Sequence, residues 1–207
     1  MPGQKASEAI RREQILTAAY EVASRNGIDG LTVRAVAARA KLSHGLVLFH
    51  FKRKEQLVSA LLDRVLATTL KIQMSEDVAR LPQALDRYRA LLRQEMDRLS
   101  RDPRRTRLFF EYWALGTRHH ATRTKISAEL DRYRTAFRAT IEELLQTESA
   151  RFTGVTADGL AAVAVSFING CAVQAMIDPE HFDIEEYLAA VQGITGRLAS
   201  PTDQCGA

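Results

Sequence analysis

Helical periodicity runs through almost the whole 207-residue chain, and it constrains the fold more than any other feature. In most segments apolar side chains recur every three or four residues, as they do along one face of an amphipathic helix. Alternating apolar and polar runs joined by Asn-Gly turns, which would indicate β-hairpins, do not stand out in the sequence. The pattern therefore predicts an all-α protein of about nine helices.

The composition indicates a folded core. Hydrophobic residues make up 46% of the chain, which excludes disorder for most of it. The first residues lack the apolar stretch of a signal peptide, and we expect no segment to reach the roughly 20 apolar residues that cross a bilayer. Cys171 and Cys205 lie in an apolar and a polar segment, so a structural disulfide is not expected. We expect a cytoplasmic protein that does not bind membranes.

Charge is distributed unevenly along the chain. Residues 1–54 carry 10 Lys and Arg against 4 Asp and Glu, and the remainder carries 19 against 21. A basic first quarter on a near-neutral body is typical of a nucleic-acid-binding head joined to another module, although an idle solvated surface would have the same composition.

Three short helices are predicted in this basic quarter. The first covers about residues 8–26, and the glycines of "RNGIDG" end it. Thr32 and Ser43 are expected to cap the second and third helices, and the third runs from His44 to about His50. Val47 and Phe51 follow at core spacing. This arrangement predicts a helix-turn-helix, whose last helix has the size to enter the major groove of DNA.

The third helix and the basic run after it divide into two groups of expected DNA contacts. Side chains at the start of the helix reach base edges, whereas side chains at helix starts and edges meet phosphates. Gly45 indicates a close approach of the backbone to DNA or, equally, a tight helix crossing. The residues expected to contact DNA are Thr32, Arg34, Ser43, His44, Gly45, Leu46, Phe49, His50 and Lys54.

The stretch "LTVRAVAARAKLSHGLVLFHFKRKEQLVSALL" resembles the DNA-binding head of the TetR family of bacterial transcription regulators. The resemblance is strong over about residues 8–57, and it departs from the family pattern at Leu48, usually aromatic, and at Lys52, often proline. It implies a dimeric, ligand-responsive regulator, most often a repressor, with a helical body for effector binding and dimerisation. Two-fold symmetry implies a palindromic operator in double-stranded DNA.

Residues 54–199 read as this body, and residues 200–207 as a disordered tail, so the DNA-binding domain is expected at 1–53. Aromatic residues at helical spacing suit either plain packing or the wall of a cavity for a small molecule. An amide in the apolar segment 157–177 needs a partner, either across a dimer axis or on a ligand. The candidate ligand-binding residues are Phe109, Tyr112, Trp113, Tyr133, Phe137 and Asn169.

The segment "ADGLAAVAVSFINGCAVQAMI" is apolar almost all round, so one of its faces is expected to pack on a second copy of the chain, unless the helix is wholly internal. Together with the helix from residue 184 it would form a four-helix interface. The expected interface residues are Val165, Phe167, Leu188 and Val191. Arg104, Arg105 and Arg107 are either solvated or placed to contact the first or fourth helix.

Nothing in the sequence indicates an enzyme. Phosphate-binding glycine loops, Cys-x-x-Cys pairs and nucleophile motifs do not occur, and the adjacent His119 and His120 point about 100° apart on a helix. We therefore expect no cofactor and no metal site. An unregulated architectural DNA-binding protein, or a helical enzyme or carrier with an incidental basic end, are the alternatives.

Overall fold

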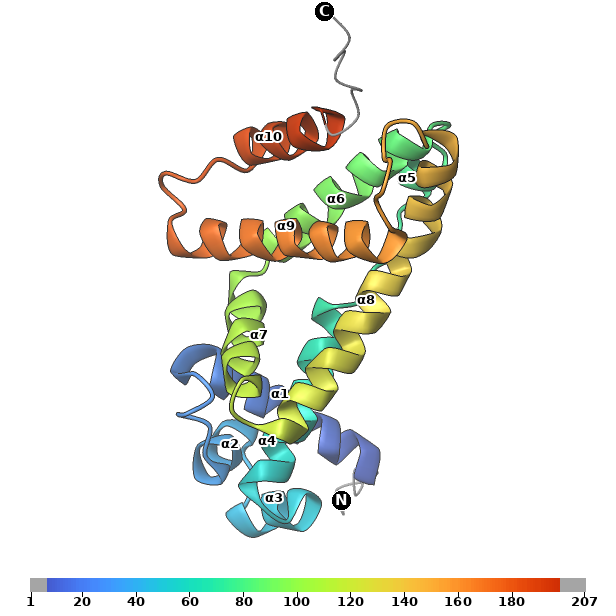
Figure 1. Cartoon of the computed structure of the whole chain (residues 1–207). Helices are drawn as coiled ribbons and strands as arrows, with labels where there is room; N and C mark the ends of the chain where they lie inside the picture. Colours follow the sequence, from blue (N-terminus) through green and yellow to red (C-terminus); the bar gives the residue numbers. More distant parts are fainter. Residues whose placement is uncertain (1–6, 198–207) are drawn as a thin grey trace, which may run out of the picture. The chain divides into compact units, whose positions relative to one another are not determined.

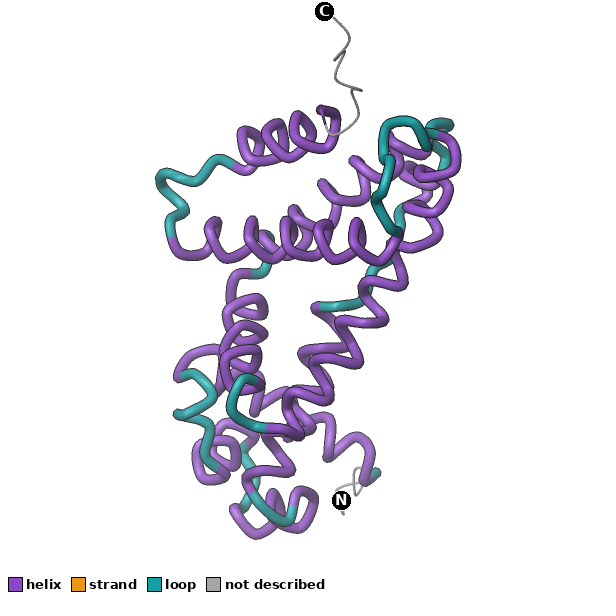
Figure 2. Tube along the Cα trace, viewed as in Figure 1, coloured by secondary structure: helices purple, strands orange, loops and turns teal. Residues whose placement is uncertain are grey.

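The computed structural model describes residues 7–197, with side chains as far as residue 194, and in this range it holds ten α-helices and no strand (Figures 1 and 2). The all-α prediction is confirmed. The helices are α1 Glu8–Asn26, α2 Val33–Ala40, α3 His44–Phe51, α4 Lys54–Thr69, α5 Glu76–Ala79, α6 Ala84–Ser100, α7 Pro103–Gly116, α8 His120–Thr147, α9 Ala157–Ile177 and α10 Ile184–Arg197. The predicted tail 200–207 lies outside the described residues.

The helices divide into two compact units. The head unit consists of residues 7–69 with Arg104–Ala128, and the body unit of Leu70–Pro103 with residues 129–197. This division differs from the expected boundary at residue 54, because α4 and most of α7 belong with the first three helices. Hydrogen bonds explain this: the Tyr112 hydroxyl of α7 donates to the carbonyl of Val58 in α4 at 2.8 Å, and Arg107 of α7 donates to the carbonyl of Ser24 in α1.

The core of the head unit lies where α1 and α3 each pack against both α2 and α4. It includes aliphatic side chains that are completely inaccessible to solvent, each stabilising the fold by about 1.5–3 kcal/mol. They are Ile15, Leu31, Val36, Val47, Leu57 and Leu61.

The segment between α4 and α6 differs from the expectation. The sequence pattern predicts a long helix over about residues 54–76, followed by the break "SEDVARLP", but α4 ends at Thr69 and a separate single turn, α5, begins at Glu76. Gln94 of α6 holds the intervening segment, since its amide donates to the carbonyl of Gln73 at 2.8 Å and accepts from the amide of Ser75 at 3.0 Å. Tertiary hydrogen bonds thus replace helical ones, and the tenth helix results.

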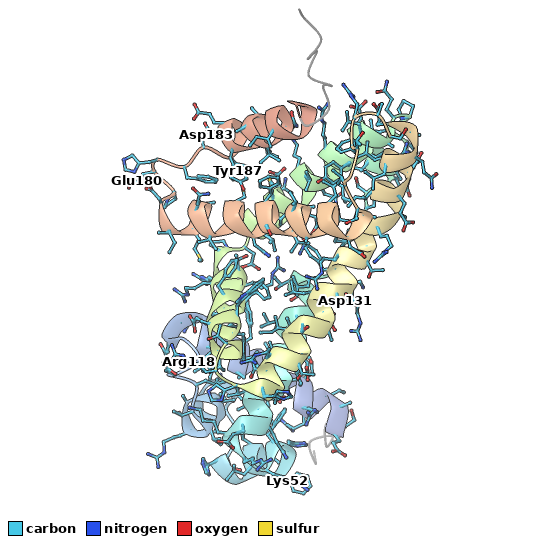
Figure 3. The ribbon with its side chains drawn as sticks, in the orientation of Figure 1. Lys52, Arg118, Asp131, Glu180, Asp183 and Tyr187 are labelled. Carbon is cyan, nitrogen blue, oxygen red and sulfur yellow. The ribbon has the colours of Figure 1, made fainter. Side chains whose placement is uncertain are left out.

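The body unit is organised around α9, which packs against α6 and α10. Tyr187 attaches α10 to α9, because its hydroxyl donates to the carbonyl of Phe167 at 3.0 Å (Figure 3). Arg93 of α6 binds Glu185 at the start of α10 through two hydrogen bonds of 2.5 Å. These contacts hold α10 against α9 and α6.

One expectation about hydrophobicity is wrong. The helix α9 is 21 residues long with a mean hydropathy of 1.9, so by length and composition it could cross a membrane. Part of the helix packs inside the body unit, and its buried side chains are Leu160, Ala161, Ala164, Val165, Ile168, Cys171 and Ala172.

Candidate nucleic-acid interface

The two short helices α2 and α3 begin at capped residues. The Thr32 hydroxyl accepts the amide of Ala35 at 3.1 Å, and the Ser43 hydroxyl accepts the amide of Leu46 at 3.2 Å. Between the helices Lys41 adopts the left-handed conformation with φ 55°. Both predicted caps are confirmed, and because a capping hydroxyl uses only its acceptor, its hydrogen stays available for an oxygen of a bound phosphate.

The reading helix α3 has one buried and one exposed side. Val47 and Phe51 are buried, as predicted. His44 and Gly45 are exposed, and Phe49 is 74% exposed, which is unusual for a large aromatic side chain. Leu46, Leu48 and His50 are half-buried at the border between the two sides. The exposed side of α3 therefore presents one aromatic and several small or polar groups for contact with another molecule.

Gly45 has open space around it. A Cβ atom added to this residue would meet nothing within 4 Å. The alternative that a tight helix crossing requires this glycine is therefore wrong. A close approach of DNA to the backbone at Gly45 stays a prediction.

Cations without acidic partners surround α3. Five exposed basic residues in and beside the helix-turn-helix form no ion pair within residues 7–197, whereas Arg39 pairs with Glu21 and Arg64 with Glu13. Such a set is the electrostatic footprint of a polyanion site. The five are Arg34, Lys41, Lys52, Arg53 and Lys54.

Lys52 lies in the turn after α3 (Figure 3), and its backbone φ is 36°. Proline, which is common at this position in the family that the sequence resembles, has φ fixed near −65° and could not adopt this conformation. The departure at Lys52 thus changes the local backbone as well as adding a charge.

Arg12 is a residue of this site that the sequence did not indicate. Its guanidinium lies 4.2 Å from the centre of the Phe51 ring and donates to the carbonyl of His50 at 3.1 Å. Gln14 likewise donates to the carbonyl of Ala40 at the end of α2, at 2.9 Å. Polar side chains of α1 therefore hold the C-terminal ends of both helices of the motif, which is visible only once α1 is packed against them.

The six candidate ligand-binding residues fall into both units. Phe109, Tyr112 and Trp113 belong to the head unit, where Phe109 and Trp113 contact edge to face at 5.4 Å. Tyr133 and Phe137 belong to the body unit and contact in the same way at 5.7 Å. Except for Trp113, which is half-buried, these aromatic side chains are fully buried, so all four of those side chains take part in core packing.

Asn169 is the sixth candidate, and the described residues do not provide a partner for its side-chain oxygen. Its Oδ1 atom is buried and has no hydrogen-bond partner within the described residues, and the same holds for the hydroxyl of Tyr88 on α6. A buried polar atom without a partner costs about 1–3 kcal/mol, so it needs an explanation such as a bound molecule. Both atoms lie in the body unit.

A buried charge in the body unit was also missed. Glu95 is completely buried and accepts two hydrogen bonds from Arg98, at 2.9 and 2.5 Å, and one from the Tyr133 hydroxyl at 2.9 Å. Burial, with the neighbouring Glu95 carboxylate, raises the pKa of Tyr133 well above its ordinary value. Sequence periodicity placed Glu95 on an apolar face of its helix, which was the signal that could have revealed it.

The expected dimer interface needs a correction. Val165, Leu188 and Val191 are at most 6% exposed within the single chain, because α9, α10 and α6 already cover them. Phe167 is half-buried and lies against Tyr187. The apolar side chains that the same two helices expose are different ones: Val163 at 43%, Ile177 at 74% and Ile194 at 51%.

Of the two alternatives for the three arginines at the start of α7, a solvated position or a contact with α1 or α4, the contact is observed for Arg107, which donates to the carbonyl of Ser24 in α1. Four residues later, the Glu111 carboxylate accepts the amide of Ile28 at 2.8 Å. Arg104 is exposed and Arg105 half-buried. α7 is therefore fastened to the end of α1 and to the loop that follows it.

Two protein-family models match this chain. The model of bacterial regulatory proteins of the tetR family matches residues 15–61, which contain the helix-turn-helix. The model of the C-terminal domain of BetI-type transcriptional repressors matches residues 84–199, more than half of the chain.

Relatives of the same kind span most of the chain. A helix-turn-helix transcriptional regulator from the dhlA 5′ region of Xanthobacter autotrophicus is 29% identical over 92% of each chain. The nicotine-responsive transcriptional repressor HdnoR of Paenarthrobacter nicotinovorans is 26% identical over 84% of this chain and 87% of its own.

Solved structures share the fold. A transcriptional regulator from Saccharomonospora viridis in complex with choline has a TM-score of 0.72 at 18% identity, covering 91% of this chain and 96% of that one. A TetR-family regulator from Rhodococcus sp. has a TM-score of 0.67 at 19% identity, covering 93% and 100%.

Proposed function

The chain belongs to the TetR family of bacterial transcription regulators, and we propose that it is a repressor that leaves a palindromic operator when a small organic molecule binds. As a member of this family it is a DNA-binding regulator rather than an enzyme. The observation that carries the proposal is the exposed side of α3, which presents Phe49 and the open Gly45, together with the five neighbouring cations that form no ion pair within the described residues.

In this proposal α3 enters the major groove with its first turn towards the bases. His44 donates to a purine acceptor, and Leu46 contacts a thymine methyl group. Phe49 adds apolar contact further along the helix. Thr32, Arg34, Ser43, His50 and Lys54 contact phosphates on either side, and supply affinity that does not depend on sequence.

The proposed homodimer uses the exposed stripe of α9 and the neighbouring part of α10. Val163, Phe167, Gly170, Gln174 and Ile177 follow one another at spacings of four and three residues, as in a helix-packing seam, and all are at least partly exposed. Ile194 of α10 is exposed as well. Two copies joined in this way would carry two heads, which explains why the operator is expected to be palindromic.

The effector site is proposed in the body unit, which matches the BetI-type model. The unpartnered Tyr88 hydroxyl and Asn169 Oδ1 supply polar groups, and Tyr133 and Phe137 supply aromatic walls. A choline complex and a nicotine-responsive repressor among the similar proteins make amines the first class of effector to test. Aromatic faces attract such cations by about 0.5–2 kcal/mol each.

Coupling between effector and DNA would use the hydrogen bonds that α7 and the first turns of α8 make to α1, to the loop after α1 and to α4 within the head unit. Arg107 and Glu111 hold the end of α1, while Tyr112 and Lys125 hold α4, which follows the reading helix directly. An effector that binds one arrangement of these helices better than the other shifts the dimer toward that arrangement.

The experiment is a selection of genomic fragments by the purified dimer at moderate salt. The proposal expects one recurring inverted repeat, whose binding weakens when an amine such as choline or nicotine raises the melting temperature of the protein. Binding of all fragments alike would instead indicate an architectural DNA-binding protein. An effector that raises the melting temperature without changing operator affinity would contradict the regulatory part.

A further inference from the structure

The head unit has a cavity of about 510 Å³ whose lining residues all belong to that unit, and one of them, Lys54, is also an expected DNA contact. The cavity is lined by residues of α4, the C-terminal half of α7, His119 and the first turns of α8. The apolar groups of this lining include Val58, Leu62, the Tyr112 ring and Leu115. This volume lies within the range of sites for small molecules, which are typically apolar with a few polar groups.

Basic side chains stand at the rim of this cavity: Lys54, His119 and Lys125. Lys125 is fixed in place, since its ammonium group binds the Asp63 carboxylate at 2.6 and 2.7 Å and the Ser59 hydroxyl at 2.8 Å. Lys54, in contrast, is exposed and forms no ion pair within the part of the chain that the structure describes. Lys54 is therefore the cation of this cavity that could bind an anionic ligand.

We propose that this cavity binds a small organic carboxylate, with its apolar part on Leu62, Tyr112 and Leu115 and its carboxylate on Lys54. His119 and the Thr122 hydroxyl add hydrogen-bond donors at the same rim. Only one acidic side chain, Glu55, is among the residues that line the cavity. Asp63 already binds Lys125, so the cation that the cavity offers to a ligand is Lys54, and a carboxylate gains a charge-assisted hydrogen bond there.

Through Lys54, a ligand in this cavity would affect DNA binding. This step rests on the proposed function. The residue lines the cavity and is also expected to contact an operator phosphate. A carboxylate and a phosphate would compete for the same ammonium group, so each ligand should weaken the binding of the other by the same factor. An organic acid bound in this cavity would thus weaken operator binding independently of an effector in the body unit.

The test uses calorimetry on the full-length protein without DNA. The probes are 1-naphthoate, the neutral 1-naphthamide and the cationic 1-naphthylmethylamine. Naphthoate should bind once per chain and at least about tenfold more tightly than the other two. Lys54→Gln should remove that preference, and Thr122→Trp, which fills the cavity, should abolish binding of naphthoate.

Lys71→Gln is the matched control, because Lys71 is exposed and does not line the cavity; it should bind naphthoate as the unmodified protein does. Melting curves check that Thr122→Trp is folded. If that variant does not fold, the surface variant Lys54→Gln still tests the site. Equal affinity for the three probes, or naphthoate binding that Lys54→Gln leaves unchanged, would overturn the site.

A second arm measures operator binding with and without saturating naphthoate. Weakened operator binding supports the competition, and unchanged operator binding overturns it. If the protein selected no DNA sequence at all, the proposed function would be wrong. The calorimetry would still show whether the cavity binds a carboxylate. The two failures are therefore distinguishable.

Discussion

Arg12 of α1 covers the ring of Phe51, the last residue of the reading helix, with its guanidinium carbon 4.2 Å from the ring centre. The same guanidinium donates to the carbonyl of His50. A cation at the C-terminal end of a helix is favourable, and a cation over an aromatic face adds about 0.5–2 kcal/mol. One side chain of α1 thus positions the end of α3.

Arg12→Ala should lower the free energy of unfolding by about 1–2 kcal/mol and weaken operator binding, because α3 loses a contact that orients it. Arg11→Ala is the control, since the Arg11 side chain donates to Gln14 of the same helix and makes no contact with α3 in the described structure. Urea unfolding and fluorescence anisotropy with labelled operator measure the two effects. If Arg12→Ala behaved like Arg11→Ala, Arg12 would not position the helix.

Phosphate-contacting and base-contacting residues should respond differently to substitution. Lys54→Ala should weaken binding to all duplexes alike and reduce the salt slope by about one unit. His44→Ala or Leu46→Ala should cost about 1–3 kcal/mol on the operator and relax preference at one base pair per half-site. Salt titrations on operator and scrambled duplexes separate the two. Altered base preference in Lys54→Ala, with none in His44→Ala, would contradict this assignment.

Gly45→Ala should act in opposite directions on stability and on DNA binding. The added methyl group meets nothing within 4 Å, and alanine favours the helix, so the free energy of unfolding should rise by about 0.5–1 kcal/mol. Operator binding should weaken if the DNA approaches the backbone here. Thermal melting and anisotropy on the same sample measure both. A stabilised variant with unchanged operator affinity would show that DNA does not come close to Gly45.

The revised interface predicts different outcomes for neighbouring residues of α9. Val163→Glu combined with Ile194→Glu should give folded monomers, because both side chains are exposed in the single chain. Val165→Glu should instead unfold the body unit, since it buries an unpaired charge. Sedimentation gives the mass and circular dichroism the folding. A dimer that survives the double substitution would place the interface elsewhere.

Tyr88→Phe should make the protein more resistant to alkali. Burial raises the pKa of the Tyr88 phenol above its ordinary value near 10. Because the folded-state pKa is the higher one, the stability is fully present below pH 10 and is lost above it, by up to about 1.4 kcal/mol per pH unit. Removing the hydroxyl removes this loss, and it breaks no described hydrogen bond.

Urea unfolding of Tyr88→Phe and of the unmodified protein between pH 9 and pH 11 measures how the unfolding midpoint of each depends on pH. Tyr112→Phe is the comparison, because it gives up the hydrogen bond to Val58 and should cost about 1 kcal/mol at neutral pH as well. Equal pH slopes for Tyr88→Phe and the unmodified protein would show that Tyr88 ionises alike in both states.

The sequence by itself determined the local structure of this protein. The caps at Thr32 and Ser43, the buried positions of Val47 and Phe51, and the bounds of α9 were all predictable. Capping and helical period depend on residues within a few positions of one another, so they can be read without knowing the fold. The family also followed from such local patterns in residues 8–57, whereas the assigned DNA contacts are still predictions.

Only the tertiary structure decided what covers each helix. Periodicity shows that α9 and α10 have apolar faces, but it cannot show that their own chain covers Val165, Leu188 and Val191. Gln94 holds the segment that follows α4 from about 20 residues away along the chain, and Arg12 contacts Phe51 across 39 positions. These contacts join residues that are distant along the chain. Their energy depends on packing geometry, which the sequence pattern alone does not contain.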